Sequence, residues 1–287
     1  MVQSHNYKPL RRYVYKPLRR WKLKARNILF TLKFKFLLRD TISIERNKKF
    51  YSITRRDWIS RKLYVSGKYG DKKIELAAKI LTNLHFDFGF LINVGSNKGT
   101  TIIQFSDFGF KEGIGIEPNP KAFHLLTNNM KLNNLNGFKI LNIALDSKAG
   151  VVNITNNQNL GINSVEKTFD PNAMQIQSNT LDGIIDDFEV PLKKTSTLLW
   201  MDVQGFEFEV LKGSSKYIAS GCPIVLEFWP HELLKYSKTP DFEKLFAGYK
   251  GYYILSEKNP KAHRLHTLVD LFESMQGPIS FTDILVV

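Results

Sequence analysis

The sequence predicts an α/β fold with a mostly parallel sheet over residues 71–287. Short apolar runs alternate there with helical patterns, which is typical of β-α-β units. Turn residues, among them glycines and an Asn-Pro pair, follow several of these runs. The chain has 287 residues, 43% hydrophobic and 24% charged, an ordinary balance for a globular protein with one large core or two modest ones.

The first half of this region predicts two strands and three helices. In chain order we expect a helix over 71–84, a strand over 90–94, a helix over 98–105, a strand over 113–117 and a helix over 120–132. The third helix has a clear start signal. Asn119 can cap it, and Pro120 can occupy its first position, where the missing N–H costs nothing.

The second half continues the alternation, with one long interruption. We expect strands over 138–144, 151–156, 197–203, 223–228, 252–256 and 279–287, and helices over 180–188 and 206–218. The Asn- and Gln-rich stretch 156–178 reads as a loop. Loops of that length are uncommon in compact domains, so we expect this one to be functional or mobile.

The positive charge belongs to an N-terminal extension, which we place at residues 1–57, ahead of a domain over 58–287. Residues 1–70 hold 20 Lys and Arg but only 3 Asp and Glu, while the whole chain has a net charge of +14. The repeat of Tyr7–Arg12 at Tyr15–Arg20 contains prolines, which disfavour a long helix before about residue 18.

Basic residues alternate with aromatic and aliphatic ones over residues 18–38, where a helix becomes possible. This mixture suits an anionic membrane surface, which residues 1–40 would contact peripherally. A poorly ordered, solvated tail is an equal alternative, and nucleic acid is a weaker third. No apolar run is long enough to span a bilayer, and we see no secretory signal. The single Cys222 fits a reducing compartment, so we expect a cytoplasmic protein, with the inner face of a membrane as one option.

The stretch "FLINVGSNKGT" (90–100) predicts a strand, a glycine turn and a helix start. Gly95 permits a backbone conformation that other residues avoid, and Gly99 lets the helix approach closely. The first N–H groups of the helix would be free to bind an anionic part of a ligand. The spacing Gly-x-Asn-x-Gly differs from the Gly-x-Gly-x-x-Gly of dinucleotide binding, which argues against a pyrophosphate on this turn.

Glu117 stands at the end of the next predicted strand, 22 residues after Gly95. An acidic side chain there can accept hydrogen bonds from both hydroxyls of a ribose. A glycine turn followed by this acid favours a cofactor that contains a nucleoside.

With these residues in view, the chain resembles the FkbM-type family of class I S-adenosylmethionine-dependent methyltransferases. The matching motifs are "LINVGSNKGT" (91–100), "GIGIEPNPKAFHLLTNN" (113–129), "NIALDSKAG" (142–150), "NTLDGII" (179–185), "LLWMDVQGFEFEVLKGS" (198–214) and "PIVLEF" (223–228). The resemblance spans roughly residues 58–287. It implies a Rossmann-like methyltransferase fold, a seven-stranded sheet with an antiparallel last strand, S-adenosylmethionine as cofactor and usually O-methylation.

The resemblance also implies where the cofactor lies. Its methionine end would pass over the first turn, its ribose would bind Glu117 with Asn119 beside it, and its adenine would border Ala144. The positions expected to bind it are Asn93, Gly95, Ser96, Asn97, Gly99, Glu117, Asn119, Ala144 and Asp202. Two positions depart from the family pattern. Asn93 stands where Asp is common and Gln204 where Glu is common, so each lacks a charge.

Asp202 is the first candidate for a general base, because it ends a predicted buried strand beside the cofactor. Its alternative role is to hydrogen-bond the cofactor or cap the next helix. His231 is a second candidate, since imidazole exchanges protons near neutral pH, although a loop histidine is often simply exposed. Glu227 could line an acceptor pocket. Asp202 and Glu227 alone are too few ligands to predict a metal site.

The sequence therefore predicts an S-adenosylmethionine-dependent O-methyltransferase, and the expected acceptor is a hydroxyl of a glycan or lipid-linked saccharide. The acceptor rests on the family and on the basic extension alone. A nucleotide-dependent oxidoreductase is one alternative. A non-catalytic module tethered to membrane or RNA, with a degenerate cofactor site, is another.

Overall fold

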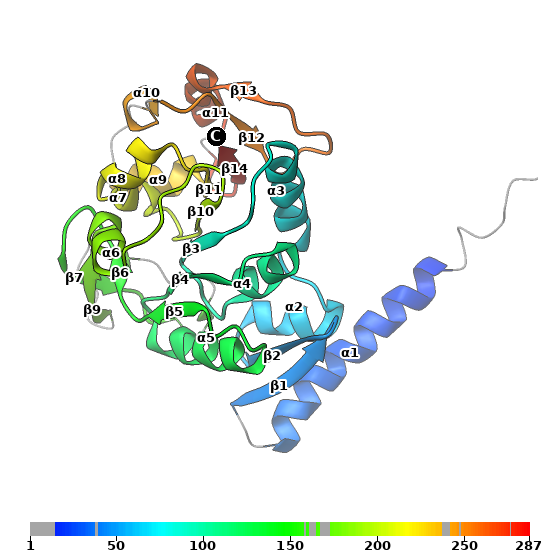
Figure 1. Ribbon diagram of the computed structural model, residues 1–287. Coiled ribbons are helices and arrows are strands. Elements are labelled where there is room, and N and C mark those ends of the chain that lie inside the picture. The colour runs from blue at the N-terminus through cyan, green and yellow to red at the C-terminus, as the bar shows by residue number, and fades with distance from the viewer. Residues whose placement is uncertain are drawn as a thin grey trace, which may run out of the picture.

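The computed structural model describes residues 15–37, 40–157, 159–160, 165–166, 173–236, 242–246, 248–275 and 277–287. Within these ranges helices cover both faces of a central sheet, which confirms the predicted α/β fold (Figure 1). The repeat at Tyr7–Arg12 lies outside the described residues.

The central sheet has the strand order β13-β12-β14-β11-β10-β3-β4-β5. Its strands are β3 (Phe90–Val94), β4 (Glu112–Ile116), β5 (Phe138–Leu141), β10 (Thr197–Met201), β11 (Ile224–Phe228), β12 (Gly251–Ile254), β13 (His263–Arg264) and β14 (Thr282–Val286). The strands from β11 to β5 in this order are parallel, and β14 is antiparallel to both β11 and β12. The antiparallel last strand is as predicted, and the two-residue β13 adds an eighth strand at the edge.

Successive residues of the central strands point to opposite faces of the sheet and so supply two cores. In β3, Leu91 packs in one core and Ile92 in the other. The helices on the Leu91 side are α3 (Asp71–Asn83), α4 (Thr100–Phe105) and α5 (Pro120–Leu132). Those on the Ile92 side are α6 (Leu181–Asp187), α7 (Glu207–Lys212), α8 (Ser215–Ser220), α9 (Pro230–Tyr236), α10 (Phe242–Leu245) and α11 (Leu268–Ser274).

A second, smaller sheet has the order β6-β9-β7-β8. Its strands are β6 (Ala144–Leu145), β7 (Gly150–Ile154), β8 (Val165–Glu166) and β9 (Met174–Asn179). The predicted extra strand is β7. The prediction of a loop over 156–178 was wrong at residues 165–166, which form β8, and in its last part, because both β8 and β9 pair antiparallel with β7. In β9, polar residues alternate with Met174 and Ile176, which pack against the core. The many polar residues of this half-buried strand explain why the sequence was interpreted as a loop.

The predicted helix over 206–218 is in fact two short helices, α7 and α8. The break falls at Gly213, where a Cβ atom would lie 2.4 Å from the carbonyl oxygen of Asp146. The backbone of α7 therefore ends against the end of β6, and the chain restarts as α8 at Ser215. Gly213 is the C-cap of α7, and the contact with Asp146 leaves no room for a side chain there.

The N-terminal helix α1 (Tyr15–Leu37) begins earlier than the prolines predicted. Pro17 is its third residue. The first turn of a helix has no intrahelical partner for its N–H groups, so a proline there removes no hydrogen bond. No helix in the described ranges is long and apolar enough to cross a membrane.

The hairpin of β1 (Thr41–Arg46) and β2 (Lys49–Thr54) was not predicted. Asn47 and Lys48 form its two-residue turn with φ of 52° and 63°, the backbone that tight hairpins need. The Asn129 side chain on α5 accepts a hydrogen bond from the Ser52 N–H at 2.5 Å. The expected extension over 1–57 thus differs from the structure, because its last part is built into the domain.

Asp57 and Lys98 join helix α2 (Trp58–Ser66) to the first turn of the central sheet. The Lys98 ammonium lies 2.5 Å from Asp57 Oδ2, and both side chains are fully buried. The same Oδ2 accepts the Ser60 N–H at 2.6 Å and so caps α2. Burial lowers the pKa of Lys98, and the charge of Asp57 opposes that effect.

We expect Asp57→Ala to lower the free energy of unfolding by about 3–5 kcal/mol, because it leaves the Lys98 charge buried without a partner. The double variant Asp57→Ala/Lys98→Met should recover part of the loss. Urea denaturation followed by circular dichroism measures both. The control is Asp186→Ala, which breaks the exposed pair with Lys216 and should cost less than about 1 kcal/mol. Equal losses for Asp57→Ala and Asp186→Ala would contradict the expectation.

Candidate functional site

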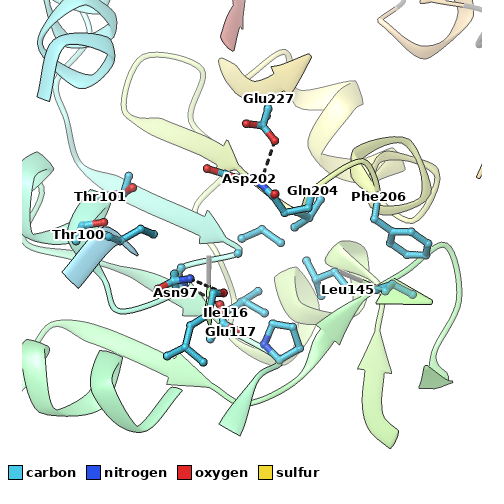
Figure 2. Close-up of a pocket in the computed structure, with 18 of the residues that line it drawn as sticks. Asn97, Thr100, Thr101, Ile116, Glu117, Leu145, Asp202, Gln204, Phe206 and Glu227 are labelled. Carbon is cyan, nitrogen blue, oxygen red and sulfur yellow. Dashed lines mark hydrogen bonds between the residues drawn. The ribbon is translucent and has the colours of Figure 1, made fainter. Parts of the chain in front are cut away.

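A cavity of about 320 Å³ opens at the carboxyl ends of the central strands, where α/β sheets commonly bind ligands (Figure 2). Its lining comes from the turns after β3 and β4, from β6, and from the ends of β10 and β11. The lining residues of these segments are Val94, Gly95, Ser96, Asn97, Ile116, Glu117, Pro118, Ala144, Leu145, Asp202, Val203, Gln204, Phe206, Glu227 and Trp229.

The turn after β3 lies directly against the end of β10. Gly95 has φ +74°, and a Cβ atom there would lie 1.9 Å from the carbonyl oxygen of Asp202. Gly99 has φ +80°, and its Cβ would lie 2.7 Å from the side chains of Leu126 and Met130 on α5. The positive φ favours glycine at both positions, and at Gly95 the carbonyl of Asp202 also leaves no room for a side chain.

The backbone N–H groups of this turn are used within the protein. Ser96 N–H donates to the Ile116 carbonyl at 2.9 Å, and Gly99 N–H donates to the Ser96 carbonyl at 2.8 Å. Asn97 N–H donates to Glu117 Oε2 at 2.7 Å, and Lys98 N–H donates to Asn97 Oδ1 at 2.9 Å. Free N–H groups were expected at the start of a helix over 98–105, and this is wrong for Lys98 and Gly99, whose N–H groups bond within the turn; helix α4 itself begins at Thr100.

Glu117 follows β4 and is held by two backbone N–H groups. Its Oε2 accepts from Asn97 at 2.7 Å, and its Oε1 accepts from Asn119 at 2.8 Å. Burial raises the pKa of Glu117 to about 7, against the opposing effects of these two hydrogen bonds and of Lys98. A carboxylate oxygen can accept two hydrogen bonds, so each oxygen keeps an acceptor site for a ligand.

Apolar side chains line the part of the cavity beyond Glu117. They come from β4, β6, β7, β8, the segment between β7 and β8, and the residue before α7, and they are Ile116, Ala144, Leu145, Ile154, Leu160, Val165 and Phe206. The Asn97 side chain holds one side of this region, because its Nδ2 donates to the Leu160 carbonyl at 2.9 Å. The result is an apolar slot next to one carboxylate.

The structure places most of the expected cofactor positions on the cavity, but not all. Gly95, Ser96, Asn97, Glu117, Ala144 and Asp202 line it. Asn93, Gly99, Asn119 and His231 are not lining residues.

The expected residues outside the lining have roles within the fold. Asn93 is buried in β3, donates from Nδ2 to the Trp200 carbonyl at 3.3 Å, and leaves its Oδ1 without a partner. Asn119 caps α5 through its Oδ1, which accepts from the N–H groups of Lys121 and Ala122. His231 lies on α9, away from the lining.

A cluster of Asp202, Gln204 and Glu227 stands opposite Glu117 in the cavity (Figure 2). Gln204 Nε2 donates to Asp202 Oδ1 at 2.8 Å and to Glu227 Oε2 at 3.0 Å. Burial, reinforced by the charge of Asp202, raises the pKa of Glu227 well above its ordinary value. The amide of Gln204 thus separates two carboxylates, a role that a glutamate at this position could not fill without a proton.

Lys73 and Asp283 extend this cluster, and neither was predicted. Lys73 Nζ lies 2.7 Å from Asp283 Oδ1, 3.8 Å from Asp202 Oδ2 and 5.6 Å from the centre of the Trp200 ring. Burial lowers the pKa of Lys73, but the two carboxylates raise it more, so the ammonium stays charged. Lys73 and Asp283 are 210 residues apart in sequence, which explains why no local motif contains them.

Four aromatic residues line the cavity on the side of the acidic cluster, and they form two pairs. The rings of Trp58 and Tyr69 lie 5.2 Å apart, and those of Trp229 and Phe281 lie 5.4 Å apart. Phe281 is 53% exposed and Trp58 is 43% exposed, so large apolar surfaces face outward here. Phe228, by contrast, is fully buried in the core. Among the described residues no group of three or more His, Cys, Asp or Glu could hold a metal ion.

A glycine turn after the first central strand, an acid after the second and an antiparallel last strand together define a Rossmann-like methyltransferase fold. The family model for the methyltransferase FkbM domain matches residues 93–262. The chain therefore belongs to the FkbM methyltransferase family, and S-adenosylmethionine is its cofactor.

Two solved methyltransferase structures are similar to this chain at low sequence identity. Precorrin-6y C5,15-methyltransferase from Geobacter metallireducens is 12% identical, with a TM-score of 0.39 over 74% of this chain and 86% of that one. TYW2 from M. jannaschii, solved with AdoMet, is 15% identical, with a TM-score of 0.39 over 86% of this chain and 84% of that one. At this similarity their substrates say nothing about the acceptor of this chain. No curated protein matched.

The residues of the cavity fit S-adenosylmethionine. Glu117 keeps acceptor sites for the ribose hydroxyls, and the apolar slot around Leu145 can hold the adenine. Gly95 and Ser96 of the turn line the same cavity, where the methionine end would lie, and so does the carboxylate of Asp202.

We expect the affinity for S-adenosylhomocysteine to rise roughly tenfold between about pH 6 and pH 8. The pKa of Glu117 is raised to about 7, so the charged form that accepts hydrogen bonds best prevails only above that pH. Glu117→Gln should weaken binding by roughly tenfold or more at pH 8 and flatten this pH dependence. Calorimetric titration measures both. Glu112→Gln, at the exposed start of β4, is the control, and a pH dependence that survives Glu117→Gln would count against the assignment.

Gln204→Glu should lower the free energy of unfolding by about 2–4 kcal/mol at pH 8, because it replaces two hydrogen bonds to charged groups with repulsion. The loss should become smaller as the pH is lowered to 6, because the raised pKa of Glu227 favours uptake of a proton, which restores a donor within the cluster. Urea denaturation at the two pH values tests this. Gln204→Met is the control that removes the donor without adding charge, and its loss should not depend on pH in this way.

Proposed function

We propose that the protein is an S-adenosylmethionine-dependent O-methyltransferase whose acceptor is a hydroxyl of a glycan or lipid-linked saccharide. One observation carries the proposal. The carboxylates and the two aromatic pairs lie on the same cavity as the cofactor positions. Aromatic faces can stack on the apolar face of a sugar ring, and carboxylates can accept hydrogen bonds from its hydroxyls.

When bound, S-adenosylmethionine supplies a methyl group on a positively charged sulfur. The task of the chain is to hold a hydroxyl oxygen in line with that carbon–sulfur bond at near-attack distance. Glu117 and the apolar slot would hold this donor, which would supply its methyl group to the hydroxyl oxygen and keep the electron pair of the carbon–sulfur bond on sulfur. Asp202 takes the hydroxyl proton, which then leaves to solvent, since the Asp202 side chain is 27% exposed.

The neighbours of Asp202 fix its orientation for this role. Gln204 donates to its Oδ1 at 2.8 Å, and the Lys73 ammonium lies 3.8 Å from its Oδ2. One amide donor and one ammonium charge therefore hold the carboxylate between the cofactor positions and the aromatic side of the cavity. His231, the other candidate base, is not on the cavity and is not part of this proposal.

Membership of a methyltransferase family argues against the oxidoreductase alternative. An assay of methyl transfer distinguishes the enzyme from the non-catalytic alternative. Purified protein, labelled donor and cell-envelope glycans should give a glycan heavier by one methylene unit, detected by mass spectrometry. Binding of S-adenosylhomocysteine without any labelled product would support a non-catalytic module instead.

Asp202→Asn should lower kcat by about 10²–10⁴, the usual contribution of a general base, while S-adenosylhomocysteine affinity changes little. Initial rates and calorimetry on the same preparation measure the two quantities. Asp270→Asn, an exposed change on α11, is the control and should leave both unchanged. If His231→Ala lost activity while Asp202→Asn kept it, the base would be misassigned.

A further inference from the structure

Helix α1 uses one face to pack against the domain. Phe30 and Phe34 are 3% and 1% exposed, and their rings lie 5.0 Å apart. Phe30 also meets Tyr64 of α2 at 5.3 Å. Both phenylalanines belong to the core cluster on the Leu91 side of the sheet. The C-terminal part of α1 is thus anchored, while its N-terminal part runs out past α2 (Figure 1).

The opposite face of α1 is a continuous exposed apolar stripe. Its members recur at the spacing of a single helix face and fall within an arc of about 100°. They are Trp21 (75% exposed), Ala25, Ile28 (62%), Leu29 (53%), Leu32 (38%) and Phe36 (76%). No described segment covers these side chains, although five of the six are large and apolar. A stripe of this kind marks an interaction surface.

Basic residues flank the stripe on both sides. At 100° per residue, Lys22 and Lys33 fall on one side, and Lys24 and Lys35 fall on the other. Residues 15–37 contain no acidic residue, and Lys22, Lys24 and Lys35 form no salt bridge with a described residue. A shallow hollow between α1 and α2 adds Arg61 beside Lys24, Ile28 and Leu32.

We propose that this stripe, with its flanking lysines, docks α1 in the plane of an anionic lipid surface. A helix that lies in the plane of a membrane surface can place its apolar side chains among the acyl chains and its flanking lysines among the anionic headgroups. A second copy of the chain fits less well, because pairing two stripes would bring their lysine rows together. Nucleic acid offers phosphates for the lysines but no apolar surface for Ile28, Leu29 and Leu32. The proposal does not depend on the methyltransferase assignment.

The test is sedimentation of the full chain with vesicles of equal parts phosphatidylcholine and phosphatidylglycerol. The wild type should bind these vesicles, release with rising salt, and bind pure phosphatidylcholine vesicles far more weakly. Ile28→Ser/Leu32→Ser should reduce binding at least tenfold. Lys24→Gln/Lys35→Gln should reduce it about 25-fold, or roughly fivefold for each lysine. Point variants are preferable to deletion of α1, which would also remove Phe30 and Phe34 from the core.

Matched controls change exposed residues of the same kinds elsewhere. Val151→Ser/Ile279→Ser and Lys258→Gln/Lys261→Gln should bind vesicles like the wild type. Unchanged affinity for S-adenosylhomocysteine shows that each variant is folded. The proposal is overturned if the stripe variants bind like their controls. It is also overturned if Ile28→Ser/Leu32→Ser converts a dimer to a monomer in analytical ultracentrifugation without weakening vesicle binding.

Discussion

The site depends on one contact between backbones, where the turn after β3 meets the end of β10. A Cβ atom at Gly95 would lie 1.9 Å from the carbonyl oxygen of Asp202, so any side chain at position 95 would force the two strand ends apart. This contact brings the cofactor side of the cavity, with Glu117 tied to the same turn through Asn97, next to the carboxylate of Asp202. The glycine therefore sets the distance between the two halves of the proposed chemistry.

The cavity concentrates charges that a protein optimised for stability alone would avoid. Burial raises the pKa of both Glu117 and Glu227, which means that each ionised carboxylate costs folding free energy. Gln204 and Lys73 offset part of that cost by hydrogen bonding and by charge. Functional sites commonly lower the stability of a fold. Here the destabilising charges lie around a hydrogen-bond acceptor, Glu117, and a proposed base, Asp202.

Local signals in the sequence were sufficient for the central sheet and for much of the site. The apolar run at Phe90–Val94 is β3, and the Asn119 cap is the start of α5. Glu117 and Asp202 were predictable because each directly follows a buried strand, and parallel strands end at one edge. Lys73 and Asp283 were not, since their pairing joins segments 210 residues apart. The break at Gly213 carries a local signal, because glycine commonly ends a helix, and the contact with Asp146 leaves no room for a side chain there. Asn93 lies within a matching motif, but its side chain is buried and donates to the Trp200 carbonyl of the neighbouring strand. The motif alone did not show that this side chain is kept from the cavity.

The two faces of α1 also limit how the proposed lipid contact could be ended. Because Phe30 and Phe34 complete the core from the inner face of the same helix, proteolytic removal of the helix would open the core. Release from a lipid surface would therefore have to act on the intact helix, through ionic conditions or through covalent changes that reduce its positive charge.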